Sequence, residues 1–311
     1  MEKIGKFFYH LKNGGLRGVI RQSLLYFVKK MDASSQSRLV EGSGDLELIK
    51  KNQTIKNIHA GERCFIIGSG PSLKKLDLTH LKDDYFIGVN AVYLNPQLPR
   101  TPKSLWCTMD SFVKPFIDML DHSVPWLKAL EEATSDQTHY FFPVQGQEFC
   151  QKNGLFTGRQ IHYLAFGDTI GFNEPEPSYY SSRLELDAPL ISPHNIIETA
   201  VTCAAYMGFS KIYLIGCDSD WFLYDDLNIN HFYTRDPKGL VETQSENHEK
   251  KDYFVMDTRE KKLFYSYLLY RNYRLLRDAL APRGVQIINA SGGGMLDMFP
   301  KEDFHSLFMS S

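Results

Sequence analysis

Five short apolar runs, each ending in small or polar residues, constrain the possible fold more than any other feature of the sequence. Between several of them lie segments with a helical spacing of apolar residues, at 196–207 and 259–281, and the second stops before Pro282 and Gly284. Strands that alternate with helices are typical of a mainly parallel sheet with helices on both faces. The sequence therefore predicts an α/β fold. The five runs are CFIIG (64–68), YFIGVN (85–90), SLWCTMD (104–110), KIYLIGCD (211–218) and VQIINAS (285–291).

The chain is predicted to divide into a basic helical extension with its linker, residues 1–58, and one α/β domain, residues 59–311. Residues 1–31 contain seven Lys or Arg and one acid, and apolar residues recur there at helical spacing. Such a helix can lie on an anionic membrane surface, or it can pack on the main domain or on a second subunit, and the sequence leaves both open. Residues 134–193 are rich in aromatic residues, Pro and Gly without a clean period, so we expect an irregular, lid-like insertion there.

Composition disfavours several classes of protein. The net charge of -2 provides no overall field that would attract nucleic acid. The five cysteines are far apart and form no C-x-x-C pair, which favours reduced thiols and a cytoplasmic location. No apolar run approaches the ~20 residues of a membrane span, and the N-terminus lacks the pattern of a signal peptide. We therefore expect a cytoplasmic protein, peripheral on the inner face of the membrane if residues 1–31 bind lipid; a homo-oligomer stays open.

A glycine-rich turn follows the first apolar run directly, made of Gly68, Ser69, Gly70, Pro71 and Ser72. Glycine lets the backbone turn sharply and approach a ligand, proline fits the first turn of a helix, and either serine can cap that helix. The pattern predicts a helix N-terminus with free amides, which suits phosphate; the alternative is an ordinary strand-to-helix turn. NAD and P-loop chemistry are disfavoured, because the third glycine and the Lys-Ser/Thr pair are absent and Asn90 stands where the dinucleotide fingerprint requires an acid.

Small or polar residues also end the other strands, at the edge where parallel α/β sheets bind their ligands. Asn195 and Glu198 have the spacing of a capping box, which predicts a second helix N-terminus facing this edge, with Ser192 before Pro193 as an alternative start. Asp218 is predicted to accept hydrogen bonds from a ribose or a base amine; alternatively it caps the next turn. The residues that end these strands are Asn90, Asp110, Gly216, Cys217, Asp218, Asn289, Ala290 and Ser291.

A long polar and aromatic loop comes next, as expected of a functional loop. His231 and His248 are candidates for a general base, since histidine can take a proton near neutral pH, although either can equally be an ordinary loop histidine. Tyr224 and Tyr233 can donate hydrogen bonds to a leaving phosphate. The D-x-D sequence at 218–220 can hold Mg²⁺ or Mn²⁺ together with a nucleotide sugar.

Several of these elements resemble known families. The resemblance to bacterial sialyltransferases with a variant, Rossmann-like GT-A fold lies in three stretches: FIIGSGPSLKKLD (65–77), FIGVNAVY (86–93) and GFSKIYLIGCD (208–218). The 6-hydroxymethylpterin diphosphokinase-like family, with which Maf-type flagellin-modifying glycosyltransferases share a region, is similar to NHFY (230–233) and IINASGGGMLDMFPKEDFHSLF (287–308). The resemblance covers about residues 60–308 and implies a Rossmann-like fold.

In those sialyltransferases the donor is a CMP-activated nine-carbon acidic sugar. The resemblance implies that Gly68, Ser69 and Gly70 lie along the nucleotide. It also implies that Asn90 contacts the nucleotide and that Asp218 binds the cytidine side.

The chain departs from the family pattern at three of its positions. Asp110 stands where the family has a second asparagine, Asn195 stands where it has Ser/Thr-Gly, and Tyr224 matches its tyrosines only loosely. The family uses a histidine about thirty residues beyond the acid as general base, without a metal. His248 fits this spacing, whereas His231 lies in the stronger local motif, so both stay open.

Together these features predict an inverting glycosyltransferase that moves a CMP-activated acidic sugar, a sialic acid or a related ulosonic acid, onto a surface glycan or glycolipid. No cofactor or metal is expected. One alternative is a pterin-type pyrophosphokinase that uses ATP and Mg²⁺ with Asp218 and Asp220, and the other is a non-catalytic nucleotide- or glycan-binding protein. The predicted binding residues are Gly68, Ser69, Gly70, Ser72, Asn90, Asp110, Asn195, Gly216, Asp218 and Ser291, and the catalytic candidates are His231, His248 and Tyr224.

Overall fold

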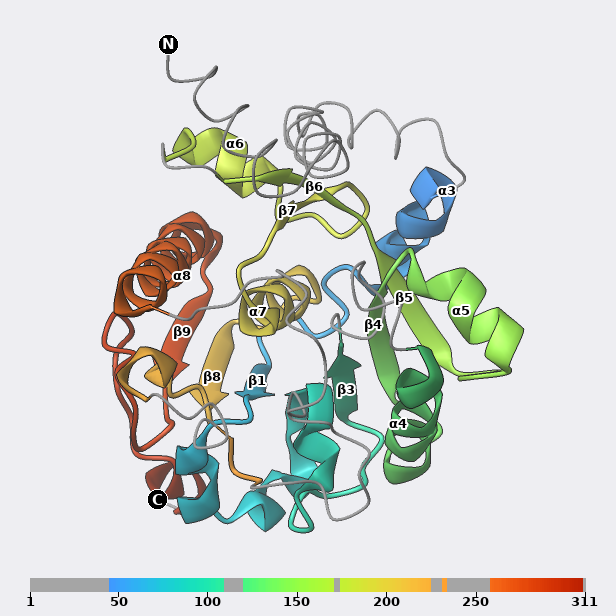
Figure 1. The fold of residues 1–311 in the computed structure, drawn as a ribbon, viewed down its shortest axis with the longest axis horizontal. Helices are drawn as coiled ribbons and strands as arrows, with labels where there is room; N and C mark the ends of the chain where they lie inside the picture. The colour runs from blue at the N-terminus through green and yellow to red at the C-terminus, as the bar shows by residue number, and fades with distance from the viewer. Residues whose placement is uncertain (1–44, 109–119, 171–173, 225–230, 234–257, 310–311) are drawn as a thin grey trace, which may run out of the picture.

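The computed structural model describes residues 45–108, 120–170, 174–224, 231–233 and 258–309 (Figure 1). The predicted basic helix in residues 1–31 lies outside the described residues, so its partner, a membrane or a protein surface, stays a prediction. Within the described ranges, no helix has both the length and the apolar content needed to cross a bilayer.

The centre of the molecule is a sheet of seven parallel strands in the order β5-β4-β3-β2-β1-β8-β9. All five apolar runs form strands of this sheet, as predicted. Residues 64–67 of β1, an interior strand, are completely buried, because strands of a parallel sheet are covered on both faces. The predicted Rossmann-like α/β class is therefore confirmed. The strands are β1 (Arg63–Ile67), β2 (Tyr85–Val89), β3 (Ser104–Cys107), β4 (His139–Pro143), β5 (Gln160–Leu164), β8 (Lys211–Ile215) and β9 (Gln286–Asn289).

Helices connect and cover the strands. α7 crosses the middle of the sheet in Figure 1 and contacts β1, β2, β3 and β8, while α8 lies beside β9. The α-helices are α3 (Asp45–Lys50), α4 (Leu120–Ala133), α5 (Gly146–Asn153), α6 (Pro177–Ser182), α7 (Ile196–Tyr206) and α8 (Arg259–Leu280). The 3₁₀ helices are η1 (Lys51–Ile55), η2 (Pro71–Lys75), η3 (Leu78–Asp83), η4 (Asn90–Leu94), η6 (Trp221–Leu223), η8 (Ala281–Arg283) and η9 (His305–Phe308).

The two helices predicted at 196–207 and 259–281 agree with α7 and α8 to within one residue at each end. The Asn195 side chain accepts a hydrogen bond from the Glu198 amide at 3.1 Å, which fixes the start of α7. The Thr258 side chain accepts one from the Lys261 amide at 3.2 Å at the start of α8. Local capping chemistry therefore sets both helix starts.

The prediction of an irregular insertion at 134–193 is wrong for most of that region. It supplies β4 and β5 to the main sheet, the helices α5 and α6, and a small two-stranded parallel sheet of β6 (Phe166–Thr169) and β7 (Leu190–Ser192). β5 is an edge strand that is exposed at Gln160 and buried only from Tyr163, so its apolar signal is weak. The role of a lid stays a prediction.

The strand order reverses between β1 and β8. From β1 the chain builds outward through β2 to β5, and it then returns to β8 on the other side of β1. Sheets of this kind bind ligands at the reversal, outside the carboxyl ends of the strands. α7 begins at this carboxyl edge, because its other end lies beside the start of β1, where the His59 amide donates to the Met207 carbonyl at 2.8 Å.

Candidate functional site

The carboxyl ends of β1 and β8 are joined directly to each other. The Gly68 amide donates to the Ile215 carbonyl at 2.8 Å, and the Gly70 amide donates to the Gly216 carbonyl at 2.8 Å. A Cβ atom at Gly68 would overlap the Gly216 carbonyl, and Gly216 has a φ of 62°. These glycines let the two strand ends approach each other, whereas the sequence predicted that they let a ligand approach.

Asp218 occupies the start of the helix that follows this turn. The Ser72 amide donates to Asp218 Oδ2 at 2.8 Å, and the Ser72 hydroxyl donates to Oδ1 of the same carboxylate. Burial raises the pKa of Asp218, and the hydrogen bonds from Ser72 act in the opposite direction. A side chain of the protein therefore fills the place where the sequence predicted the phosphate of a ligand.

We therefore correct the prediction that the helix after the glycine-rich turn begins with free amides. η2 is a 3₁₀ helix of five residues, and neither Ser69 nor Ser72 caps it through a side chain. The amides of Gly70 and Ser72 donate to the Gly216 carbonyl and to Asp218, so neither is available to a ligand in this arrangement.

His231 lies against the same turn, although it is 162 residues away from Ser69 in the sequence. Its Nδ1 atom is 3.0 Å from Ser69 Oγ, and the Phe232 amide donates to the Ser69 carbonyl at 2.8 Å. The ring of Tyr233 stacks on the imidazole with centroids 4.9 Å apart and planes 4° from parallel. Burial lowers the pKa of His231, while a hydrogen bond with the Ser69 backbone acts in the opposite direction. The net lowering of the pKa favours the neutral imidazole, the state that a general base requires.

Hydrogen bonds tie the loop after Asp218 both to itself and to α8. Tyr224 donates to Asp220 Oδ2 at 3.1 Å, and this hydrogen bond is the main cause that raises the pKa of Tyr224. Ser219 has a φ of 53°, a left-handed conformation that a residue other than glycine seldom adopts. Asp218 and Asp220 thus face different partners, and the described residues contain no group of three or more His, Cys, Asp or Glu that could hold a metal ion.

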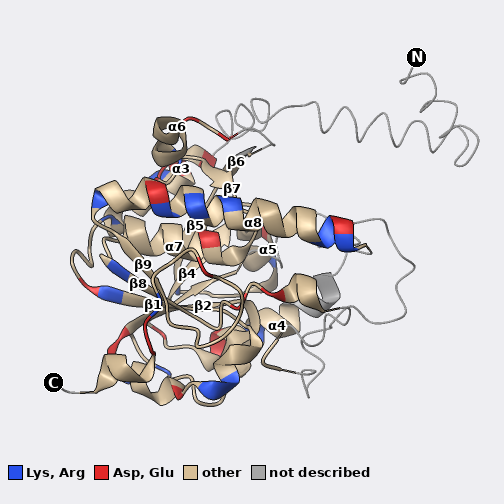
Figure 2. Ribbon diagram, turned by 90° about the vertical axis from the view of Figure 1, so that its left-hand side faces the viewer, with Lys and Arg blue, Asp and Glu red and all other residues tan. Residues whose placement is uncertain are grey.

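Three residues of α8 that the sequence did not single out support this loop and the start of α7. Figure 2 shows α8 along one side of the molecule with Lys and Arg at intervals along it. Lys262 Nζ donates to the Tyr224 carbonyl at 2.6 Å, and the Tyr270 hydroxyl donates to the Ser219 carbonyl at 3.1 Å. The Tyr273 hydroxyl accepts from Asn195 at 2.7 Å. The positions 262, 270 and 273 share one side of a helix with 3.6 residues per turn, which was the available signal.

Both polar atoms of the Asn195 side chain form hydrogen bonds within the protein. Its oxygen caps α7, and its Nδ2 donates to the buried Tyr273 hydroxyl. Asn195 therefore ties the start of α7 to α8, at the edge where the sequence predicted a binding residue.

Asn90 and Ser291 end strands on either side of β1 and β8. Asn90 has a φ of 45°, its carbonyl accepts from Trp106 Nε1 at 3.1 Å, and its Oδ1 accepts from the Thr108 hydroxyl at 3.4 Å. Ser291 has no exposed surface; its hydroxyl accepts from the Cys217 amide at 3.1 Å and donates to the Leu214 carbonyl at 3.3 Å. Ser291 therefore joins β8 to β9 inside the fold, contrary to the prediction that it faces a ligand.

Two of the predicted residues, Asp110 and His248, lie outside the described residues. The structure therefore brings together the glycine-rich turn, Gly216, Asp218 and His231, and leaves the roles of Asp110 and His248 as predictions.

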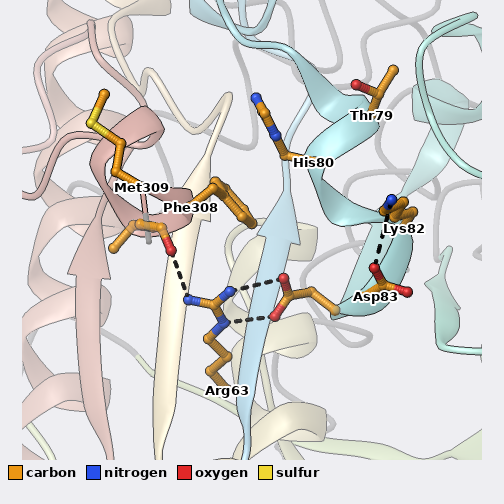
Figure 3. Close-up of a pocket in the computed structure, with 9 residues that line it drawn as sticks. Arg63, Thr79, His80, Lys82, Asp83, Phe308 and Met309 are labelled. Atoms are coloured by element: carbon orange, nitrogen blue, oxygen red, sulfur yellow. Dashed lines mark hydrogen bonds and ion pairs between the residues drawn. The ribbon is translucent and has the colours of Figure 1, made fainter. Parts of the chain in front are cut away.

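A cavity of about 690 Å³ lies at the opposite, amino edge of the sheet (Figure 3). Arg63, the first residue of β1, points into it, and its guanidinium is bound by both oxygens of Asp84 at 2.6 and 2.9 Å. The Leu307 carbonyl accepts from Arg63 Nη1 at 3.3 Å. Because Arg63 and Gly68 are at opposite ends of β1, this cavity is separate from the predicted site.

Comparisons with known proteins yield similarities of structure only. No protein-family model matches the chain. No curated protein matches it. One solved structure, the sialyltransferase CstII from Campylobacter jejuni in complex with a substrate analogue, cytidine-5'-monophosphate, is 12% identical; 78% of this chain and 85% of that chain are covered, with a TM-score of 0.36. Another, the sialyltransferase CST-II in complex with trisaccharide acceptor and CMP, is 13% identical over 77% of this chain and 85% of that chain, with a TM-score of 0.38. The predicted resemblance to the pterin diphosphokinase-like and Maf-type families has no counterpart in these comparisons and stays a prediction.

Proposed function

We propose that the protein is an inverting glycosyltransferase that moves a CMP-activated acidic sugar onto a glycan or glycolipid acceptor. The observation that carries this proposal is the contact of His231 with the glycine-rich turn at the reversal of the strand order. A nucleotide sugar laid across this edge would bring its anomeric carbon near a base that can take the proton of the acceptor hydroxyl.

His231 is the proposed base. It takes the proton of the acceptor hydroxyl as the acceptor oxygen attacks the anomeric carbon of the donor. The bond between that carbon and the CMP phosphate breaks, and CMP leaves with the electron pair. His231 is favoured over His248 here because its contacts with Ser69 and Tyr233 hold it at the edge where the strands end.

The departing phosphate needs a partner other than the start of η2, whose amides at Gly70 and Ser72 already donate within the protein. We place the phosphate toward the start of α7, which also begins at this edge. Tyr224, which follows Asp218 in the same loop, is a further candidate donor to the phosphate. Lipid-bound acceptors would reach the enzyme at a membrane surface if residues 1–31 bind lipid, which is part of the same proposal.

A panel of nucleotides tests the proposal directly. The melting temperature is measured with CMP, UDP, GDP, ADP and ATP, each with and without Mg²⁺. We expect CMP alone to raise it, equally in EDTA, because a ligand at 100 times its Kd stabilises the folded state by about 2.7 kcal/mol. A rise with ATP that requires Mg²⁺ would favour the pyrophosphokinase instead, and a CMP shift without any transfer from a CMP-sugar would favour a binding protein.

A further inference from the structure

Ser69 contacts the His231 segment through both its side chain and its backbone. Ser69 Oγ lies 3.0 Å from His231 Nδ1, and the Ser69 carbonyl accepts from the amide of Phe232, the next residue, at 2.8 Å. We infer that Ser69 is a positioning residue, which holds His231 as the Nδ1–H tautomer and leaves the lone pair of Nε2 for the acceptor proton. The chemical meaning of this inference rests on the proposed function, but the geometry does not.

The proposed role of His231 as a base decides which nitrogen must carry the hydrogen. A neutral imidazole has one N–H and one nitrogen with a free lone pair, and only the second can take a proton. Nδ1 faces Ser69 Oγ at 3.0 Å, so Nε2 is the nitrogen left for the acceptor hydroxyl. Nδ1 then carries the hydrogen and donates it to Ser69 Oγ, while the Ser69 carbonyl holds the next residue by accepting from the Phe232 amide. A histidine with Nδ1–H has an unprotonated Nε2, which is the atom that can act as a base.

Among the described groups that face the imidazole ring, Ser69 is the main polar group that can affect its pKa and tautomer. Tyr233, from the same segment, stacks on the imidazole through its ring. Among the described residues, burial and the Ser69 backbone are the causes that shift the pKa of His231, and no charged side chain contributes. A change in tautomer or pKa after substitution of Ser69 therefore reports this contact and not a distant charge.

The same pair could instead activate Ser69 as a nucleophile, but the backbone around it argues against this. A serine nucleophile needs nearby free amides to stabilise the oxyanion that forms. The amides of Gly68, Gly70 and Ser72 all donate within the protein, to Ile215, Gly216 and Asp218. A nucleophilic serine would also donate its hydrogen to Nδ1, which requires the opposite tautomer.

Nuclear magnetic resonance of the full chain labelled with ¹⁵N-histidine tests the tautomer without any substrate. The signals of His231, one of ten histidines, are identified by their loss in His231→Gln. We expect the neutral ring in the parent to be mainly Nδ1–H, against the usual preference of free imidazole for Nε2–H. Ser69→Ala should raise the Nε2–H population and lower the pKa of the ring, Ser69→Thr should restore both, and Ser306→Ala, an exposed serine on η9, should change neither.

Kinetics with a CMP-sugar donor give a second readout. Ser69→Ala should lower kcat about 2- to 10-fold, the worth of one neutral hydrogen bond, with the acid limb of kcat/KM displaced to lower pH and KM for the donor unchanged. A mainly Nε2–H ring in the parent, an unchanged tautomer ratio in Ser69→Ala, or labelling of Ser69 by a fluorophosphonate would each overturn the inference. Absence of transferase activity would overturn the proposed function, while the spectra would still decide the role of Ser69.

Discussion

Two of the helices that begin at the carboxyl edge of the sheet, η2 after β1 and α7 before β8, each have a buried carboxyl group at their start. At η2 this group is Asp218, which accepts hydrogen bonds from the amide and the hydroxyl of Ser72. At α7 it is Glu198, which accepts from the His194 amide at 3.3 Å and from Asn272 Nδ2 at 3.1 Å. At both helix starts the protein itself supplies a carboxyl group that accepts hydrogen bonds, but from residues of different origin.

The difference lies in the distance along the sequence. Asp218 reaches Ser72 across 146 residues, whereas Glu198 belongs to the first turn of the helix that it serves. The long-range contact joins β8 to the turn after β1 and so shapes the edge at which His231 lies. The contact of Glu198 with the His194 amide shapes the start of one helix, and the hydrogen bond from Asn272 Nδ2 joins that start to α8. A glycine-rich turn at the end of a strand is thus not sufficient for a phosphate site, because an internal carboxylate can take the position of the anion.

The largest effect is expected at the first of these helix starts, from His231→Ala. Loss of a general base should lower turnover by about 10²–10⁴-fold. The rise of the melting temperature with CMP should be unchanged, since the base acts on the acceptor. His80→Ala is the matched control, because His80 lies at the amino edge of the sheet beside the cavity of Figure 3 and should leave turnover unchanged. Normal turnover of the His231→Ala enzyme would rule out His231 as the base.

The next largest effect is expected from Asp218→Asn, which tests whether the long-range carboxylate holds η2. The amide nitrogen cannot accept the hydrogen bond that one carboxylate oxygen now accepts from Ser72. We expect the free energy of unfolding to fall by about 1–3 kcal/mol, measured from the urea midpoint at constant slope. Asp83→Asn is the control, because that side chain is 83% exposed. An unchanged midpoint together with weaker CMP binding would show instead that Asp218 serves the ligand, as the sequence predicted.

The sequence predicts well what depends on neighbours in the chain. The five apolar runs became strands because their burial needs only a few consecutive apolar residues, and the start of α7 was found because Asn195 and Glu198 are three residues apart. β5 was missed because it lies at the edge of the sheet, where half of its residues need not be apolar.

The sequence predicted only those features of the candidate site that follow from the topology of the sheet. Parallel strands bring their carboxyl ends together, so Gly68, Gly216 and Asp218 could be placed at one edge without knowing their contacts. No local pattern links Ser69 to His231, which are 162 residues apart, and none distinguishes Asp218 as a partner of Ser72 from Asp218 as a ligand of a nucleotide. The prediction that Ser291 faces a ligand was wrong for a related reason: a serine after a strand can bind a neighbouring backbone amide as readily as a ligand.

A dependence of stability on pH, which for each pH unit is no larger than the effect of Asp218→Asn, is expected at the second helix start. Burial raises the pKa of Glu198 from 4.5 to about 8, so the folded protein keeps a proton that the unfolded chain loses. The stability from this protonated carboxyl is fully present below about pH 4.5 and is lost as the pH rises through about 8, at no more than ~1.4 kcal/mol per pH unit. Urea midpoints between pH 5 and pH 8 should therefore fall less in Glu198→Gln than in the parent. Equal slopes in the two proteins would contradict a buried, protonated Glu198.

The smallest effect is expected from the local cap itself, Asn195→Ala. Removal of an N-cap side chain costs about 1 kcal/mol, so the urea midpoint should fall by less than in Asp218→Asn. Asn195→Ser keeps an oxygen for the Glu198 amide and should recover most of the loss, although it gives up the hydrogen bond from Nδ2 to Tyr273. If the serine variant were no more stable than the alanine variant, the bond to Tyr273 would be the contact that matters. The start of α7 would then depend on α8, as the start of η2 depends on β8, and both helix starts would be fixed by contacts distant in the sequence.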